Sequence, residues 1–324
     1  GEDANFPEEW LMSTVAARNA GREHIVEGIT RVSGTELTLP ELIGKCPREM
    51  LGQEHTERYG EALGVLVKLL DAAERLTLQV HPTRETAKRL FRSPFGKTEC
   101  WHVIGAREIG GEKPCIYLGF REGVTEAEWR RCFCEQDIPA MLACLHRIPV
   151  SIGDTYIVRG GVPHGIGAGC FLVEIQEPTD FTVRTERVTP SGLRVAESML
   201  HQGVGFDKMF ECFEYGGASL EQTLAAYKVE PRAEKGEGYT LTHVIYPEVT
   251  DMFALDMIEA KGSVTLRSDG RFSGLYVLSG KGTLGGKEIR ACDHFFLPAT
   301  CESVTLAGTQ AKPLRVIRCF GPAN

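Results

Sequence analysis

The sequence predicts a mainly β protein of two domains, with a helical insertion in the first domain. Short apolar segments separated by Gly-rich turns recur along the chain, which is typical of strands. Apolar residues at helical spacing are concentrated at about 122–148. The length of 324 residues and the apolar content of 42% provide enough core for two domains.

The composition disfavours several classes of partner. The net charge is -8 and no block of Lys or Arg occurs, so nucleic acids and anionic membranes are poor partners. No apolar run approaches the roughly 18 residues that a membrane span requires. The eleven cysteines include no Cys-x-x-Cys pair, and the first residues are acidic and polar. We therefore expect reduced, mostly buried thiols, no signal peptide and a cytoplasmic protein.

The first part of the chain combines strand and helix signals. Residues 7–14 predict an early strand, and residues 36–48 predict one or two short helices. Residues 63–70 are strongly apolar and predict a buried strand that contains Lys68. A Lys in a buried strand needs a partner or an anionic ligand, unless its long side chain reaches the surface, and both interpretations stay open.

The next strand presents the first candidate metal ligands. Apolar and polar residues alternate over 76–81, which places Thr77, Gln79 and His81 on one face. Glu99 comes 18 residues after His81, beyond a charged helix-like piece and a Pro/Gly turn. A returning strand would bring its carboxylate beside this histidine. Amide, imidazole and carboxylate groups suit a borderline divalent metal such as Zn²⁺.

A fourth ligand is predicted at His164. A Gly-Asp turn signal at 153–154 comes before a strand, and a Gly-rich turn at 160–161 redirects the chain just before this histidine. A Gly-Asp start followed by a His beyond a Gly turn resembles the second half of a cupin-type metal site.

Motifs that occur in a fixed order carry a resemblance to a known family. They are Gln-Val-His-Pro at 79–82, Gly-Lys-Thr-Glu-Cys-Trp at 96–101, Pro-His-Gly-Ile-Gly-Ala-Gly at 163–169 and Val-Glu-Ile-Gln at 173–176. Arg184 lies ten residues after the Glu of the last motif. Together they resemble type I mannose-6-phosphate isomerase, over about residues 60–190.

The resemblance implies a fold and a metal centre. The fold would consist of two cupin-like (jelly-roll) β-sandwich domains. One Zn²⁺ per chain would be held by the ligands Gln79, His81, Glu99 and His164. The metal would polarise or position the oxygens of a sugar phosphate.

The resemblance also implies a reaction, which interconverts mannose 6-phosphate and fructose 6-phosphate through a cis-enediolate. Arg184 stands where the family has a catalytic Arg, which can hold an anion or a developing enediolate. Arg187 and Arg194 are the alternatives for this role, unless they are ordinary surface charges. Lys97 would add positive charge near the metal, and Lys68 and Thr77 would contribute to the phosphate pocket. Glu174 is the candidate for the base that moves the proton.

Helical signals separate the first candidate ligands from His164. Thr125 and Glu128 form a capping box before apolar residues at helical spacing. Residues 137–146 predict a second helix that ends at His146, and the aromatic and Met residues of both helices are predicted to be core. Residues 195–235 are interrupted by glycines and predict a linker of mixed helical character.

From about residue 239 the pattern is entirely β. Apolar segments separated by Gly turns occur at 253–258, 262–266, 274–279, 282–284, 294–297, 303–306 and 314–320. This spacing is typical of a β-sandwich or barrel. Residues 279–299 resemble a second cupin copy that lacks paired His or Glu ligands, so we expect this copy to be metal-free.

These signals combine into a domain prediction. The predicted parts are a catalytic cupin domain at 1–200 with its insertion at about 122–148, a linker at 201–238 and a metal-free cupin-like domain at 239–324. The expected partner is a small-molecule sugar phosphate. We expect a monomer or a homodimer.

Two alternatives stay open. The first is a non-catalytic sugar-phosphate-binding cupin, and the one feature in its favour is that this sequence lacks the Trp-Gly-Gly segment that the family usually carries near its start. A cupin metalloenzyme of another class, such as an iron dioxygenase or an enzyme for another sugar, is the second alternative. A dioxygenase would normally show a His-x-His pair or a facial triad, and the spacing of Gln79, His81 and Glu99 argues against it.

Overall fold

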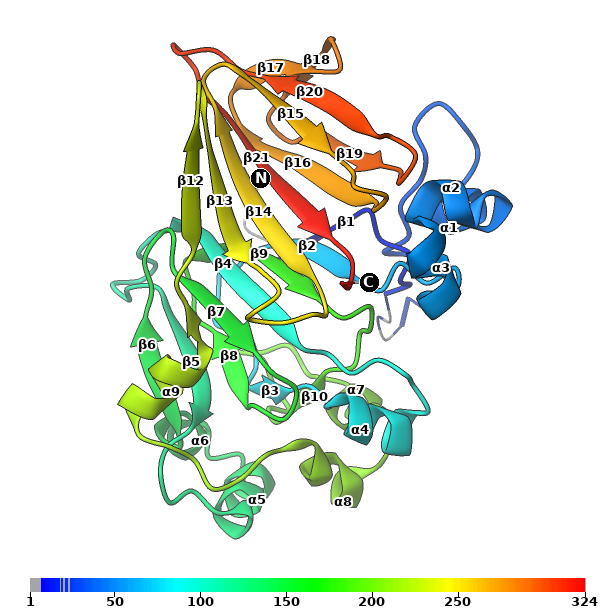
Figure 1. The fold of residues 1–324 in the computed structure, drawn as a ribbon. Helices are drawn as coiled ribbons and strands as arrows, with labels where there is room; N and C mark the ends of the chain where they lie inside the picture. The colour runs from blue at the N-terminus through cyan, green and yellow to red at the C-terminus, as the bar shows by residue number, and fades with distance from the viewer. Residues whose placement is uncertain (1–6, 18, 20, 23, 324) are drawn as a thin grey trace. The chain divides into compact units, whose positions relative to one another are not determined.

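The computed structural model describes residues 7–17, 19, 21–22 and 24–323 of the protein (Figure 1). Most of its regular structure is antiparallel β-sheet, so the predicted mainly β class is confirmed. The chain forms two compact units, each of which gathers segments that are separated in the sequence. The first unit holds 68–229, 7–9 and the described part of 18–25, and the second holds 10–17, 26–67 and 230–323.

The first unit contains most of two sheets. The six-stranded sheet has the order β1 (Glu8–Leu11), β2 (Leu66–Asp71), β9 (Cys170–Gln176), β4 (Glu99–Ala106), β7 (Thr155–Val158), β11 (Lys228–Val229). The five-stranded sheet has the order β10 (Val183–Arg184), β3 (Gln79–Val80), β8 (His164–Ile166), β5 (Cys115–Phe120), β6 (Leu145–Pro149). Between Gln79 and Glu99 lies the predicted helix-like piece, which includes α4 (Arg84–Thr86).

The strand registers bring the candidate residues together. β3 pairs with β8 so that Gln79 lies opposite His164, and with β10 so that Arg184 lies opposite Gln79. β4 pairs with β9 so that Glu99 lies opposite Gln176. Because opposite residues of an antiparallel ladder share a face, side chains from separate motifs meet on adjoining strands.

The predicted helical insertion is present. The hydroxyl of Thr125 accepts a hydrogen bond from Glu128 N at the start of α5 (Glu126–Glu135), as an N-cap does. Trp129 and Phe133 of α5 are buried, as is Met141 of α6 (Ile138–Ala143). The prediction that the aromatic and Met residues form core is therefore confirmed.

The second helix of the insertion is shorter than predicted. α6 ends at Ala143, and β6 begins at Leu145 and pairs with β5. His146 is consequently a strand residue, and its Nε2 lies 2.9 Å from Ala218 O. Helical periodicity could not reveal this, because pairing with β5 decides the conformation of these residues.

The predicted helical character of the segment after residue 195 is also present. It forms α7 (Glu197–His201), α8 (Phe206–Met209) and α9 (Leu220–Tyr227). This segment belongs to the first unit up to residue 229. None of the helices in the described ranges is long and apolar enough to cross a membrane.

The second unit contains two antiparallel sheets and three short helices. The larger sheet has the order β12 (Arg232–Gly236), β13 (Tyr239–Ile245), β14 (Ala254–Ala260), β21 (Leu314–Phe320), β16 (Ser273–Ser279), β19 (His294–Leu297). The smaller sheet has the order β15 (Ser263–Arg267), β20 (Ser303–Ala307), β17 (Lys281–Leu284), β18 (Lys287–Arg290). The helices are α1 (Leu39–Lys45), α2 (Pro47–Leu51) and α3 (Gln53–Tyr59).

The helices predicted at 36–48 pack in the second unit. Ala299 N donates a hydrogen bond to Met50 O at 3.0 Å, which ties the end of α2 to the loop after β19. The segment predicted as the first domain, 1–200, therefore contains residues of both units, and 201–229 belong to the first. The boundaries at 200 and 238 stay a prediction.

Candidate metal centre and adjoining pocket

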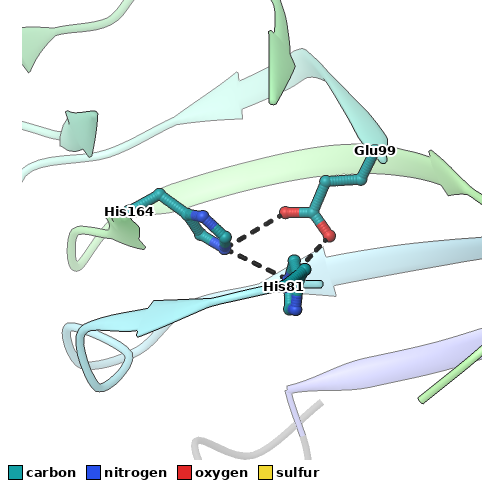
Figure 2. Close-up of side chains that lie close together, drawn as sticks. All are labelled: His81, Glu99 and His164. Carbon is teal, nitrogen blue, oxygen red and sulfur yellow. Dashed lines mark hydrogen bonds and ion pairs between the residues drawn. The ribbon is translucent and has the colours of Figure 1, made fainter. Parts of the chain in front are cut away.

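Three of the predicted ligands form one buried cluster in the first unit. His81 directly follows β3, Glu99 begins β4 and His164 begins β8. Figure 2 shows the two imidazole rings and the carboxylate directed toward one another. His81 Nε2 lies 3.1 Å from Glu99 Oε2 and 3.2 Å from His164 Nε2, and His164 Nε2 lies 3.5 Å from Glu99 Oε1. All are fully buried.

Backbone carbonyls orient both imidazole rings. His81 Nδ1 lies 2.8 Å from Phe181 O, and His164 Nδ1 lies 2.8 Å from Val162 O. A carbonyl accepts only, so each Nδ1 carries the proton and each Nε2 presents a lone pair to the cluster. Glu99 Oε1 has no hydrogen-bond partner within the described chain. Two lone pairs and an unsatisfied carboxylate oxygen at one point fit a divalent cation.

The protonation states also fit a cation. Burial lowers the pKa of His81 to about 3 and also lowers the pKa of His164, so both rings are neutral at neutral pH. Burial alone would raise the pKa of Glu99, but the Lys97 ammonium and His81 hold it well below its usual range. Neutral imidazoles and an ionised carboxylate are the forms that bind a metal.

Lys97 contacts this cluster directly. Its Nζ lies 2.7 Å from Glu99 Oε2 and 2.8 Å from His81 Nε2, and the side chain is buried. A bound cation would compete with this ammonium for the same oxygen and nitrogen. The fourth predicted ligand, Gln79, lies opposite His164 in the ladder and lines the adjoining pocket.

A pocket of about 570 Å³ adjoins these residues within the first unit. Its lining includes these residues predicted to form the site: Lys68, Thr77, Gln79, Lys97, Glu174 and Arg184. A volume of this size is in the range of small-molecule sites. The structure thus gathers the predicted residues around one pocket and its buried cluster.

Lys68 is buried and paired, so its side chain does not extend into solvent. Its Nζ lies 3.2 Å from Glu8 Oε2 and 3.5 Å from Glu174 Oε1. Burial alone would lower the pKa of Lys68, but these two carboxylates raise it above its ordinary value, and the amine stays charged. Sequence reasoning missed Glu8, because nothing in the strand signal at 7–14 distinguished it from its neighbour Glu9.

Glu174 is a buried carboxylate held in the wall of the pocket. The indole nitrogen of Trp101 donates to Glu174 Oε2 at 3.1 Å. Burial and the nearby Glu99 charge raise the pKa of Glu174 to about 7, against the lowering effect of Lys97 and Lys68. A carboxylate that titrates near neutrality can both accept and return a proton.

Arg184 differs from the other cations of the pocket in its partners. It is half-buried, and its Nη1 donates to Thr182 O at 3.2 Å and to Met199 O at 3.3 Å. Burial lowers its pKa from the usual arginine value, but an arginine stays charged at neutral pH. Among the described residues no carboxylate lies within ion-pair distance of its guanidinium. This cation is therefore available to an anionic ligand.

A second missed residue, Glu186, fixes the segment that carries Thr77 and leads into β3. Its carboxylate receives hydrogen bonds from Leu78 N at 2.6 Å and from Arg75 at 2.5 and 2.8 Å. Glu186 is buried, so these donors have no competition from water. The partners lie 108 and 111 residues away in the sequence, and no local signal could have revealed them.

The chain is similar in sequence to known mannose-6-phosphate isomerases. The phosphomannose isomerase type I catalytic domain matches residues 26–95. A mannose-6-phosphate isomerase of Streptococcus mutans is 28% identical over 268 residues, which cover 79% of this chain and 76% of that protein. A mannose-6-phosphate isomerase described as putative, from Bacillus subtilis, is 26% identical over 274 residues, covering 80% of this chain and 78% of that protein.

Solved structures share the fold. The mannose 6-phosphate isomerase of Bacillus subtilis superposes with a TM-score of 0.74 at 23% identity, covering 97% of this chain and 89% of that one. A putative mannosephosphate isomerase of Archaeoglobus fulgidus gives 0.72 at 19% identity, covering 98% and 88%. The resemblance predicted from the four motifs is confirmed: the chain is similar to mannose-6-phosphate isomerases in sequence, to the type I catalytic domain over residues 26–95, and to their solved structures in fold.

Proposed function

We propose that the protein is a metal-dependent aldose–ketose isomerase that interconverts mannose 6-phosphate and fructose 6-phosphate. The observation that carries the proposal is the buried convergence of His81, Glu99 and His164 beside a pocket that contains Lys97, Glu174 and Arg184. These are the groups that a proton transfer next to a carbonyl needs: an acceptor for the proton and positive charge for the oxygens.

The metal in this proposal is one Zn²⁺ per chain. Gln79, His81, Glu99 and His164 would hold it, since their oxygen and nitrogen donors suit zinc. When bound, it would supply positive charge that polarises the sugar carbonyl and hydroxyl oxygens.

Glu174 is the proposed base. It would take the proton from C2 of the aldose and return it to C1 of the cis-enediolate, while a hydroxyl proton moves from one sugar oxygen to the other. The pKa of about 7 leaves the carboxylate partly ionised at neutral pH and lets it act in both directions. The Trp101 hydrogen bond holds the carboxylate in one orientation.

Arg184 is the proposed anchor for the negative charge of the phosphate or the enediolate. Among the described residues, the hydrogen-bond partners of its guanidinium are backbone carbonyls, and Thr77 lines the same pocket. Lys68 is already paired with Glu8 and Glu174. To bind a phosphate, its ammonium would give up its contact with one of these carboxylates. The cytoplasmic location and the monomeric or dimeric state stay predictions.

The test is conversion of mannose 6-phosphate to fructose 6-phosphate by zinc-loaded protein, before and after chelation. We expect turnover that chelation abolishes and zinc restores, and that a His81→Ala variant lacks, because His81 is central to the cluster. A folded, zinc-loaded protein that binds the sugar phosphate without converting it would replace this proposal with the non-catalytic binding protein.

A further inference from the structure

A second cavity of about 500 Å³ lies in the first unit, beside α7. Its lining combines the apolar side chains of Ile138, Val188 and Leu200 with two arginines, Arg187 and Arg194. The proposed isomerase reaction uses none of these residues. The proposed reaction therefore assigns no role to this second cavity.

One hairpin, residues 187–195, contributes to the lining of both cavities. Val195 N donates to Arg187 O at 3.0 Å and Thr189 N donates to Leu193 O at 2.8 Å, which makes it a tight antiparallel turn. Residues at its base line the second cavity, whereas Thr189, Ser191 and Leu193 at its tip line the pocket beside the metal cluster. A ligand that holds the base therefore constrains the tip.

The two arginines of the cavity are available to an anion. The guanidinium carbon of Arg187 lies 5.0 Å from the ring centre of Phe133 and 5.2 Å from that of Phe206, and such contacts orient a planar cation. Within the described ranges, no carboxylate lies within ion-pair distance of Arg187 or Arg194. Glu197 also lines the cavity, so its formal charge is one positive unit.

The base of the hairpin is also tied to the end of α5. Gln136 Oε1 accepts a hydrogen bond from Arg187 N at 2.7 Å, and Gln136 Nε2 donates to Thr185 O at 3.1 Å. Thr185 is the covalent neighbour of Arg184, which lines the other pocket. A change at Arg187 thus has a short, hydrogen-bonded route to the proposed substrate anchor.

We propose that this second cavity binds a small organic anion, a phosphate or carboxylate with an apolar part, and that its occupancy alters substrate binding through the hairpin. Arg187 and Arg194 bind the anionic group, and Ile138, Val188 and Leu200 contact the apolar part. The single net positive charge selects ligands of low charge over polyphosphates. The binding claim is independent of the proposed function, whereas the coupling claim rests on it.

Calorimetric titration with phenyl phosphate tests the binding claim on the zinc-loaded, full-length protein. Arg194→Gln weakens one binding event at least about tenfold, the loss expected for one charge-assisted hydrogen bond. Arg184→Gln leaves that binding event unchanged. Arg131→Gln, which removes an exposed arginine outside both cavities, changes binding at neither cavity. Equal binding by the wild-type protein and Arg194→Gln, or no Arg184-independent event, overturns the site.

Steady-state kinetics test the coupling claim. Phenyl phosphate changes the KM for mannose 6-phosphate at least about threefold more in the wild-type protein than in Arg194→Gln. Direct competition in the substrate pocket occurs in both proteins, so the difference between them measures the effect of the second cavity. An equal change in both proteins overturns the coupling. Absent turnover together with Arg194-dependent binding refutes the proposed function and supports the anion site.

Discussion

Lys97 determines how the buried cluster meets a cation. Its ammonium contacts Glu99 Oε2 and His81 Nε2, which are also atoms that a metal ion would need. A divalent cation and an ammonium repel each other strongly at such distances. Metal binding would therefore release Lys97 toward the pocket that it already lines, where its charge can meet the substrate.

Replacing Lys97 should separate metal binding from catalysis. Lys97→Met removes the competing ammonium, so we expect zinc affinity to rise by about tenfold or more, while turnover falls. Competition with a chromophoric chelator measures the affinity. Lys113→Met, which removes an exposed lysine outside the pocket, is the matched control. Weaker zinc binding by Lys97→Met would contradict this account.

The raised pKa of Glu174 predicts a pH dependence of catalysis. The base is active when ionised, so kcat/KM should rise with pH as Glu174 loses its proton. A cation on Glu99 offsets the charge that contributes to this shift, and the midpoint then falls below 7. In Glu174→Gln this rise of kcat/KM with pH should disappear, and kcat should fall by about 10²- to 10⁴-fold. A pH profile with the same midpoint in Glu174→Gln would assign the titration to another group.

The same shift has a consequence for stability. The folded-state pKa of Glu174 lies above its unfolded value, so folding disfavours the ionised form. Its unfavourable contribution is absent below about pH 4 and grows as the pH rises toward 7. The protein therefore keeps a carboxylate at a cost in stability, which is common where such a group has a chemical role.

At the scale of elements, the short strand β3 depends on partners that are distant in the sequence. Leu78 O accepts hydrogen bonds from Thr185 N and Thr185 Oγ1, both at 2.9 Å, and Leu78 N donates to Glu186. Strand β3 contains only Gln79 and Val80, so its own ladder is small. Its position is set by the segment that follows β10.

Removing the Glu186 carboxylate should therefore loosen the ligand strand. We expect Glu186→Ala to lower the free energy of unfolding by about 3–5 kcal/mol, as for a broken buried ion pair, and to weaken zinc binding. Urea unfolding and metal titration measure the two effects. Glu135→Ala, which breaks the exposed pair with Arg131, should change the free energy by no more than about 1 kcal/mol. Unchanged zinc affinity in Glu186→Ala would show that β3 holds its position without this carboxylate.

The elements also show what a sequence can and cannot predict. Alternation predicted the polar face of 76–81, and the predicted strands at 274–279 and 314–320 correspond to β16 and β21. β12 and β18 were missed, because their polar sequences carry little apolar alternation. Glu8 and Glu186 were missed for another reason: their roles depend on long-range contacts that no local spacing encodes.

At the scale of the whole molecule, the metal cluster lies entirely in the first unit. A ligand that binds only the folded state stabilises it by RT ln(1 + [L]/Kd), which is about 4 kcal/mol at 1,000 times Kd. Zinc should therefore slow hydrogen exchange most in peptides from 76–101 and 155–187. Mass spectrometry with and without chelation measures this, and peptides from 239–320 are the internal reference. Equal protection of both sets would indicate that the metal binds elsewhere or that the units unfold together.

The sequence did not predict which segments combine to form each of the two units. The chain length suggested two domains, and the Gly-separated strands after 239 indicated where one of them lies. Residues 26–67 join that part through contacts such as Ala299 N to Met50 O, between segments about 250 residues apart. Local periodicity carries no information about such pairings.

The carbonyl acceptors of the two imidazole rings have a consequence for mutational tolerance. Phe181 and Val162 contribute only main-chain oxygen atoms to His81 and His164, and a side-chain substitution does not delete a main-chain atom. Where a carboxylate plays this part, one codon change removes it. The orientation of the two imidazole rings should therefore tolerate many side-chain substitutions at these positions. The substitutions that disturb it are those that move the backbone.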